Sequence, residues 1–329
     1  MTFRTRMKRL RRVALAALVT ASVSVPLLGA GRPADVPAPA PTQAVQGPLR
    51  AATPEALAQR YAGTRADIEA AARTADEHGD TRRAKALRVL ASPARGFLSF
   101  DGRDGGRTVE VVGDLSRAER LAVLVPGAGT SVDNYWRLRK GAVALHRQLG
   151  ERTAVVAWLG YRTPVTVSLA AATEGRAEEA APGLRDFMGE LRRLKPAART
   201  SLVCHSYGTV VCARAASGVR AADIVLYGSP GTGYDDVAAL HTDAAVWASR
   251  SAGDWTENVP HMQLSTPFGT VGFGTDPVSP EFGAKVFATG GGGHSDYLEP
   301  GSEALRNIAR IVAGEGVCEQ TDREASCEN

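Results

Sequence analysis

The sequence has few cysteines and lacks two common site motifs. Among its 329 residues there are four cysteines and no CxxC pair, which argues against a zinc site built from cysteines. The segment 125–130, VPGAGT, is rich in glycine but lacks the GxxxxGK[ST] spacing, and no lysine follows it. That excludes a P-loop for nucleotide phosphates.

The chain also lacks an excess of basic charge outside its N-terminus. Its formal net charge is +4, but the first 30 residues hold six of the 39 Lys and Arg and none of the 35 Asp and Glu. The remainder therefore has 33 basic against 35 acidic residues. A nucleic-acid partner is not expected, because such a partner requires clustered basic charge.

The first 30 residues show the three parts of a secretory signal: a basic stretch, an apolar run over 13–28, and small residues at Gly29 and Ala30. The apolar run has 16 residues, fewer than the roughly 20 that span a bilayer. We expect cleavage and a secreted or extracytoplasmic protein with no stable membrane span. If the run is retained, the cell envelope is the alternative. The Pro- and Ala-rich residues 31–50 are expected to form a solvated tether.

Four cysteines in an exported chain favour disulfides over metal binding. Three pairings are open, one of which joins Cys204 to Cys212 and Cys318 to Cys327. Unpaired, buried cysteines are the other alternative. The oligomeric state is not predicted by any pattern in the sequence.

A helical segment is expected over residues 51–92. Thr53, Pro54 and Glu55 form a helix start, with a capping side chain, a proline in the first turn and an acidic residue. This helix runs toward Gly79, and Asp80 can cap a second one. Their apolar stripe is thin, so we expect them to cover part of a main domain and to carry no chemistry.

The main domain, over residues 93–315, has the pattern of an α/β protein, and a polar tail follows over 316–329. From the third run onward the apolar segments are nearly continuous, which is typical of strands covered by helices on both faces. A mostly parallel sheet of eight strands is therefore predicted. The expected strands are 96–100, 108–112, 121–125, 153–159, 200–204, 223–227, 245–248 and 285–288.

The strongest chemical motif is the segment 201–216, SLVCHSYGTVVCARAA, in which an apolar strand leads through Ser206 into a helix of small residues. It resembles a nucleophile elbow, a strained turn that exposes a serine hydroxyl. Gly208 matches the second glycine of the GxSxG pattern, whereas Cys204 replaces the first. The structural alternative is a buried serine in an ordinary turn. His205 is expected to be structural, because adjacent side chains on a sharp turn point apart.

A serine needs a histidine as its base, and His294 is the candidate that we favour. It follows the last predicted strand in GGGGHSDYLEPG, where four glycines let the loop turn back over the sheet edge. The other histidines are weaker candidates because they lie on expected helices or on less suitable loops: His78, His146, His241 and His261.

An acid must orient the histidine, and Asp254 is favoured because it follows the penultimate strand. The structural alternative is a simple Gly-Asp turn. Glu257 and Asp276 come next as candidates, while Asp296 is too close to His294 along the chain. Asp235 and Asp236, after the preceding strand, remain the second option for the acid.

Backbone amides can stabilise the negative charge that develops on an ester carbonyl oxygen. One amide is expected from Tyr207, directly after the nucleophile. The other is expected from the loop 125–130, with Ala128 favoured and Gly129 as the alternative.

With these motifs, the region from Gly96 to Gly314 resembles an alpha/beta-hydrolase, and specifically an exported bacterial branch with mostly undefined substrates. The resemblance implies an esterase or lipase that hydrolyses a small-molecule acyl substrate through an acyl-enzyme, without metal or cofactor. The alternatives are an acyltransferase or peptidase with the same triad, or a non-catalytic binding module. Segments 158–172 and 255–282 are the expected pocket walls.

Overall fold

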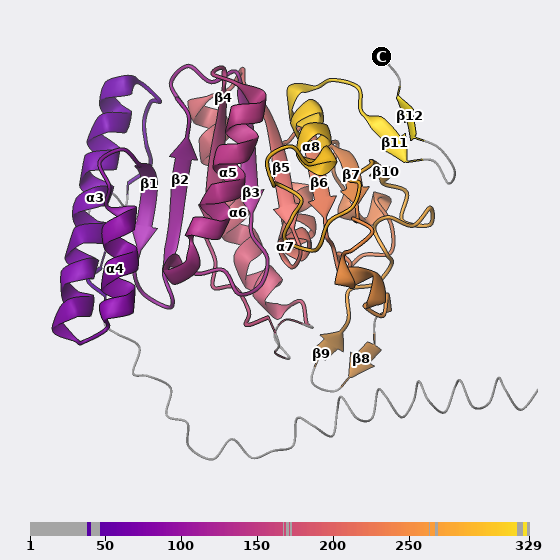
Figure 1. Ribbon diagram of the computed structural model, residues 1–329, viewed down its shortest axis with the longest axis horizontal. Helices are drawn as coiled ribbons and strands as arrows, with labels where there is room; N and C mark the ends of the chain where they lie inside the picture. Colours follow the sequence, from indigo (N-terminus) through magenta and orange to yellow (C-terminus); the bar gives the residue numbers. More distant parts are fainter. Residues whose placement is uncertain are drawn as a thin grey trace, which may run out of the picture. The chain divides into compact units, whose positions relative to one another are not determined.

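A sheet of eight strands, in the order β1-β2-β4-β3-β5-β6-β7-β10, forms the centre of the computed structural model (Figure 1). The structure describes residues 38–40, 47–166, 168, 171, 173–262, 264–266, 269–320 and 325–327, so the predicted signal and most of the predicted tether lie outside it. The strands are β1 (Gly96–Asp101), β2 (Arg107–Val112), β3 (Arg120–Val125), β4 (Thr153–Leu159), β5 (Arg199–His205), β6 (Asp223–Tyr227), β7 (Ala245–Ser249) and β10 (Lys285–Val286).

The sheet is mostly parallel, as the sequence predicted. Only β2 pairs antiparallel, with β1 on one side and β4 on the other, while β4, β3, β5, β6, β7 and β10 run parallel. Parallel strands place their carboxyl ends at one edge, where loops that are distant in sequence meet. The last strand is shorter than the expected 285–288.

Helices cover both faces of the sheet. The helices α5 (Trp136–Leu149) and α8 (Glu303–Ala313) pack on one face, and α6 (Gly175–Leu194) and α7 (Gly208–Ala215) pack on the other. Strand β3 shows why: Leu121 and Val123 enter the core under α6 and α7, whereas Ala122 and Leu124 enter the core under α5 and α8. Side chains alternate along a strand, so a strand covered on both faces must be apolar throughout.

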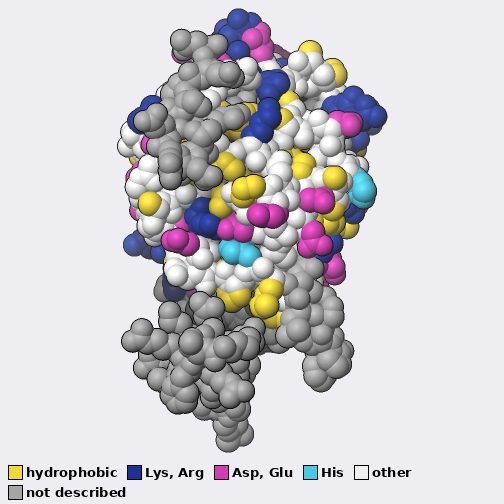
Figure 2. Space-filling model, turned by 90° about the vertical axis from the view of Figure 1, so that its right-hand side faces the viewer, with side chains coloured by type: hydrophobic (Ala, Val, Ile, Leu, Met, Phe, Trp, Pro, Cys, Tyr) yellow, Lys and Arg dark blue, Asp and Glu magenta, His cyan; other side chains and the backbone are white. Residues whose placement is uncertain are grey.

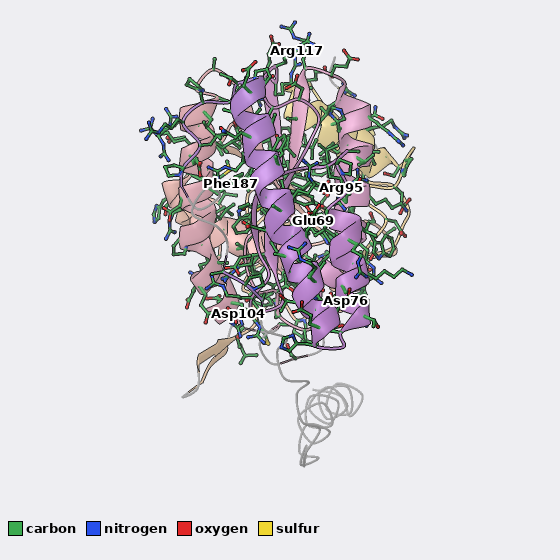
Figure 3. All side chains as sticks on the ribbon, turned by 90° about the vertical axis from the view of Figure 1, so that its left-hand side faces the viewer. Glu69, Asp76, Arg95, Asp104, Arg117 and Phe187 are labelled. Atoms are coloured by element: carbon green, nitrogen blue, oxygen red, sulfur yellow. A yellow bond between two sulfur atoms is a disulfide. The ribbon has the colours of Figure 1, made fainter. Side chains whose placement is uncertain are left out.

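The predicted helical segment consists of α3 (Pro54–Glu77) and α4 (Thr81–Leu90), which lie side by side next to β1 (Figures 1 and 3). The side chains of Thr53 and Asp80 accept backbone amides at the two helix starts, as expected for N-caps. Ile68 of α3 and Leu87 of α4 join the core beneath α5 and α8. These helices cover the sheet at the end opposite β10.

Two small hairpins were not predicted. Strands β8 (Leu264–Thr266) and β9 (Gly269–Val271) pair within the segment expected to form a pocket wall, and β11 (Cys318–Gln320) pairs with β12 (Ala325–Cys327) in the expected tail. None of the described helices is long and apolar enough to cross a membrane. Figure 2 shows the side that carries α8 and β10, where acidic, basic and hydrophobic side chains are interspersed.

Candidate active site

Ser206 occupies the sharp turn between β5 and α7. Its φ is 54°, in the left-handed region that residues other than glycine rarely adopt. The turn is packed closely against the end of β3: a Cβ added at Gly208 would lie 2.5 Å from the carbonyl oxygen of Val125. A Cβ added at Gly127 would lie 2.6 Å from the Cβ of Ser206. Small residues around a strained serine are the features of the elbow that the sequence resembles.

A disulfide between Cys204 and Cys212 spans this turn. It is one of the pairings that the sequence left open, and it joins the end of β5 to the middle of α7. Both cysteines are fully buried. The residue that replaces the first glycine of the motif is therefore tied covalently to the helix that follows the serine.

The structure brings Ser206, His294 and Asp254 together at the carboxyl edge of the sheet. His294 Nε2 lies 2.9 Å from Ser206 Oγ, and His294 Nδ1 lies 2.9 Å from Asp254 Oδ1 and 3.0 Å from Oδ2. A carboxylate only accepts hydrogen bonds, so Nδ1 carries the proton in the neutral ring and Nε2 accepts from the serine hydroxyl. This orientation suits removal of the hydroxyl proton.

Asp254 is held as an ionised carboxylate. Its side chain is buried, and burial alone would raise the pKa, but hydrogen bonds from His294, Tyr297 and the backbone of Thr256 bring the pKa of Asp254 well below its ordinary value. The amide and hydroxyl of Thr256 donate to Oδ1 over 2.9 and 2.8 Å. The carboxylate is therefore charged and fixed where it faces the imidazole.

Tyr297 is a member of the site that sequence reasoning missed. Its hydroxyl donates to Asp254 Oδ2 over 2.6 Å and accepts the amide of Ser251 over 2.9 Å. Burial and the neighbouring carboxylate raise the pKa of Tyr297 above its ordinary value, so it stays a donor. The available signal was its position, three residues after His294 in the same glycine-rich segment.

The glycine-rich loop is fixed to the loop that carries the acid. The amide of Gly253 donates to the carbonyl of Gly292 over 3.1 Å, and the amide of Gly293 donates to Asp296 Oδ2 over 2.7 Å. Asp296 thus shapes the loop of His294, which is consistent with its exclusion as the orienting acid.

His205 holds the backbone of His294 by a hydrogen bond. Its Nε2 lies 2.8 Å from the backbone carbonyl of His294 and donates to it, and the two rings are 4.7 Å apart. Burial and the neighbouring His294 lower the pKa of His205 to about 4. A neutral ring with one N–H therefore anchors the loop, in agreement with a structural role.

Two backbone amides of the loop after β3, those of Ala128 and Gly129, differ in their hydrogen bonds. The amide of Gly129 donates to the carbonyl of Pro164 over 2.8 Å, so it already has an acceptor. Across the described residues, the amides of Ala128 and Tyr207 donate to no protein acceptor. That distinction favours Ala128 over its alternative, Gly129, as a donor to the oxyanion.

The segment after β4, expected to be a pocket wall, clamps this loop. The Tyr161 hydroxyl donates to the carbonyl of Pro126 over 2.7 Å, and the Thr163 hydroxyl donates to that of Thr130 over 2.7 Å. Asn134 Nδ2 also donates to this loop, at the carbonyl of Gly129, over 2.7 Å. Fixed donors need no reorganisation during a reaction, which makes them effective.

The other candidate acids have different partners. Asp235 and Asp236 are exposed, and Asp236 accepts the amide of Ala239 over 2.8 Å. Glu257 is exposed, while Asp276 lies 2.7 Å from a guanidinium nitrogen of Arg250.

Among the described residues, none of the other candidate histidines is hydrogen-bonded to Ser206. His261 Nε2 lies 3.3 Å from Asp276 Oδ2, and burial lowers its pKa. His78 binds the carbonyl of Thr74 over 2.8 Å, and His146 belongs to α5. His241 ends a short 3-10 helix and is exposed.

Comparison with known proteins agrees with this architecture. A family model described as alpha/beta hydrolase matches residues 101–264. Uncharacterized protein Rv2079 of Mycobacterium tuberculosis (strain ATCC 25618 / H37Rv) is 30% identical over 253 residues, which cover 67% of this chain and 38% of that protein. Uncharacterized protein Rv0963c of the same strain is 30% identical over 178 residues, which cover 47% of this chain and 66% of that protein.

Solved structures with a similar arrangement include XC6422 from Xanthomonas campestris, a serine hydrolase without lid. It has 15% identity and a TM-score of 0.42, with 67% of this chain and 94% of that one covered. Est1E from Butyrivibrio proteoclasticus has 12% identity and a TM-score of 0.41, with 67% and 99% covered. This chain belongs to the alpha/beta-hydrolase superfamily. It spans about 38% of the length of the first relatives that it matches.

Proposed function

We propose that this protein is a serine hydrolase that cleaves a carboxylic ester through an acyl-enzyme. One observation carries the proposal: His294 lies within hydrogen-bonding distance of both the Ser206 hydroxyl and the Asp254 carboxylate. A partly buried histidine between a strained serine and an ionised acid is the arrangement that activates a hydroxyl as a nucleophile.

In the acylation step, Ser206 Oγ bonds to the ester carbonyl carbon while its proton moves to His294 Nε2. Asp254 stabilises the imidazolium that forms. The carbonyl oxygen becomes an oxyanion that accepts hydrogen bonds from the amides of Ala128 and Tyr207. When the intermediate collapses, the bond from carbon to the alcohol oxygen breaks, and the alcohol leaves with the proton from Nε2.

Deacylation repeats these steps with water as the nucleophile. His294 takes a proton from the water, the new oxygen bonds to the acyl carbon, and Ser206 Oγ leaves and recovers its proton. The products are the carboxylic acid, the alcohol and the free enzyme. An alcohol in place of water would give acyl transfer, so hydrolysis and transfer are separated by adding an acceptor alcohol to the assay.

The test is turnover of short-chain aryl esters by purified protein. Ser206→Ala should lower kcat on the order of 10³-fold or more, because the nucleophile is lost while the fold is kept. Ser217→Ala changes an exposed serine just beyond α7 and serves as the matched control. Equal rates for Ser206→Ala and the control would refute the proposal, and parallel assays on amides would distinguish a peptidase.

We also propose that the protein acts outside the cytoplasm. The secretory pattern of residues 1–30 motivates this, and the disulfide between Cys204 and Cys212 supports it, since such bonds form mainly in oxidising compartments. N-terminal sequencing of protein recovered from the medium and the cell envelope is the test. An intact N-terminus on protein found only in the cytosol would contradict it.

A further inference from the structure

Trp255 has a large apolar side chain that is exposed to solvent and lies beside the catalytic histidine. It directly follows Asp254 and begins a short 3-10 helix, Trp255–Asn258. The residue is 51% exposed, and its ring centroid lies 4.7 Å from that of His294, with the planes tilted by 49°. The indole therefore covers part of the imidazole and also presents an apolar surface to solvent.

The proposed reaction determines which part of an ester meets this surface. The alcohol oxygen must come within about 3 Å of His294 Nε2 to receive its proton. The carbonyl oxygen instead faces the amides of Ala128 and Tyr207, on the side of the loop after β3. Groups attached to the alcohol oxygen are thus next to the imidazole, and so next to the Trp255 ring.

The charged side chains on the segment 250–261, which carries Trp255, favour a neutral alcohol. Arg250, directly after β7, lies 2.7 Å from Asp276, and His261 lies 3.3 Å from the same carboxylate. Arg250 is thus already paired with a carboxylate, and burial lowers the pKa of His261, which disfavours its charged form, so neither side chain offers a free positive charge to an anionic group. The charged side chain on the 3-10 helix itself is the exposed carboxylate of Glu257, which repels anions.

We propose that Trp255 is a specificity-determining residue that binds the alcohol portion of the substrate and selects esters of apolar, above all aromatic, alcohols. The inference rests on the proposed ester hydrolysis and adds to it the class of leaving group. Stacking of an aromatic ring on indole, together with burial of apolar surface, gives a preference of about 10-fold.

The test compares benzyl acetate with methyl acetate, which share an acyl group and have leaving alcohols of similar basicity. The wild-type protein should show the higher kcat/KM for benzyl acetate. Trp255→Ala should lower the benzyl-to-methyl ratio of kcat/KM about 10-fold, and Trp255→Phe should keep most of it. Trp136→Ala removes another exposed tryptophan, at the start of α5, and should leave the ratio unchanged.

Deacylation separates binding of the alcohol from positioning of His294. Both esters give the same acetyl-enzyme, from which the alcohol has already left, so the deacylation rate in Trp255→Ala should equal that of the wild type. An unchanged benzyl-to-methyl ratio would overturn the inference. If kcat/KM then falls equally for both esters and deacylation is slower, Trp255 only holds the imidazole in place. Failure of the wild type to cleave any ester would instead refute the proposed function.

Discussion

Replacing His205 should change how the stability of the protein depends on pH. Burial and the adjacent His294 lower the pKa of His205 from 6.5 to about 4. Between these values the unfolded chain binds a proton that the folded protein does not, so stability falls as the pH falls through this window. A shift of this size corresponds to roughly 2 to 3 kcal/mol, allowing for the solvent that still reaches the ring.

Two substitutions separate the effect of His205 protonation from the effect of its hydrogen bond. His205→Phe removes the donor to the His294 carbonyl and should cost about 1 to 3 kcal/mol at pH 7. His205→Gln keeps an N–H donor and should cost less. Both variants lack the titrating ring, so the free energy of unfolding should fall less between pH 7 and pH 4 than in the wild type, by roughly 2 to 3 kcal/mol.

Urea unfolding at pH 7 and at pH 4 measures both effects. The triad residues are the same in all three proteins, so their own pH dependence cancels in the comparison. Equal losses of stability between the two pH values in all three proteins would refute the reasoning, because His205 would then not be held neutral by the fold.

Three further changes test other parts of the site. Asp254→Asn should lower kcat on the order of 10² to 10⁴-fold, since the imidazolium of His294 loses its charged partner; the esterase assay measures this. The double change Cys204→Ser and Cys212→Ser opens a short covalent loop across the elbow and should lower the free energy of unfolding by about 2 kcal/mol in urea titrations. Gly208→Ala forces a Cβ against backbone oxygens at the end of β3 and should cost about 1 to 3 kcal/mol, with lost esterase activity.

Each has an outcome that would contradict it. A fully active Asp254→Asn would return the acid role to Asp235 or Asp236. A double cysteine variant as stable as the wild type would mean that the disulfide adds nothing to the packing of β5 on α7. A Gly208→Ala protein with normal stability and activity would show that the elbow is less closely packed than the structure indicates.

The eight strands and the placement of the serine and histidine could be predicted because they depend on local patterns. Strands covered on both faces must be continuously apolar, and every residue of the run 121–125 is apolar. Parallel strands bring their carboxyl ends together, so Ser206 after β5 and His294 after β10 were expected at one edge.

Side-chain orientation and loop contacts could not be predicted in the same way. Tyr297 reaches Asp254 across 43 positions of sequence, and no periodic pattern encodes that contact. The choice between Ala128 and Gly129 depended on the carbonyl of Pro164, on a loop that only the folded chain brings near. The disulfide followed from the distance between β5 and α7, not from the spacing of the cysteines.

Covalent labelling of Ser206 tests the central claim most directly. A fluorophosphonate probe reacts with a serine whose hydroxyl is activated by a neighbouring base, and peptide mass spectrometry identifies the modified residue. We expect stoichiometric labelling at Ser206 in the wild-type protein and a strong loss of labelling in His294→Ala. Folded protein that stays unlabelled, or that is labelled equally in both forms, would contradict the account.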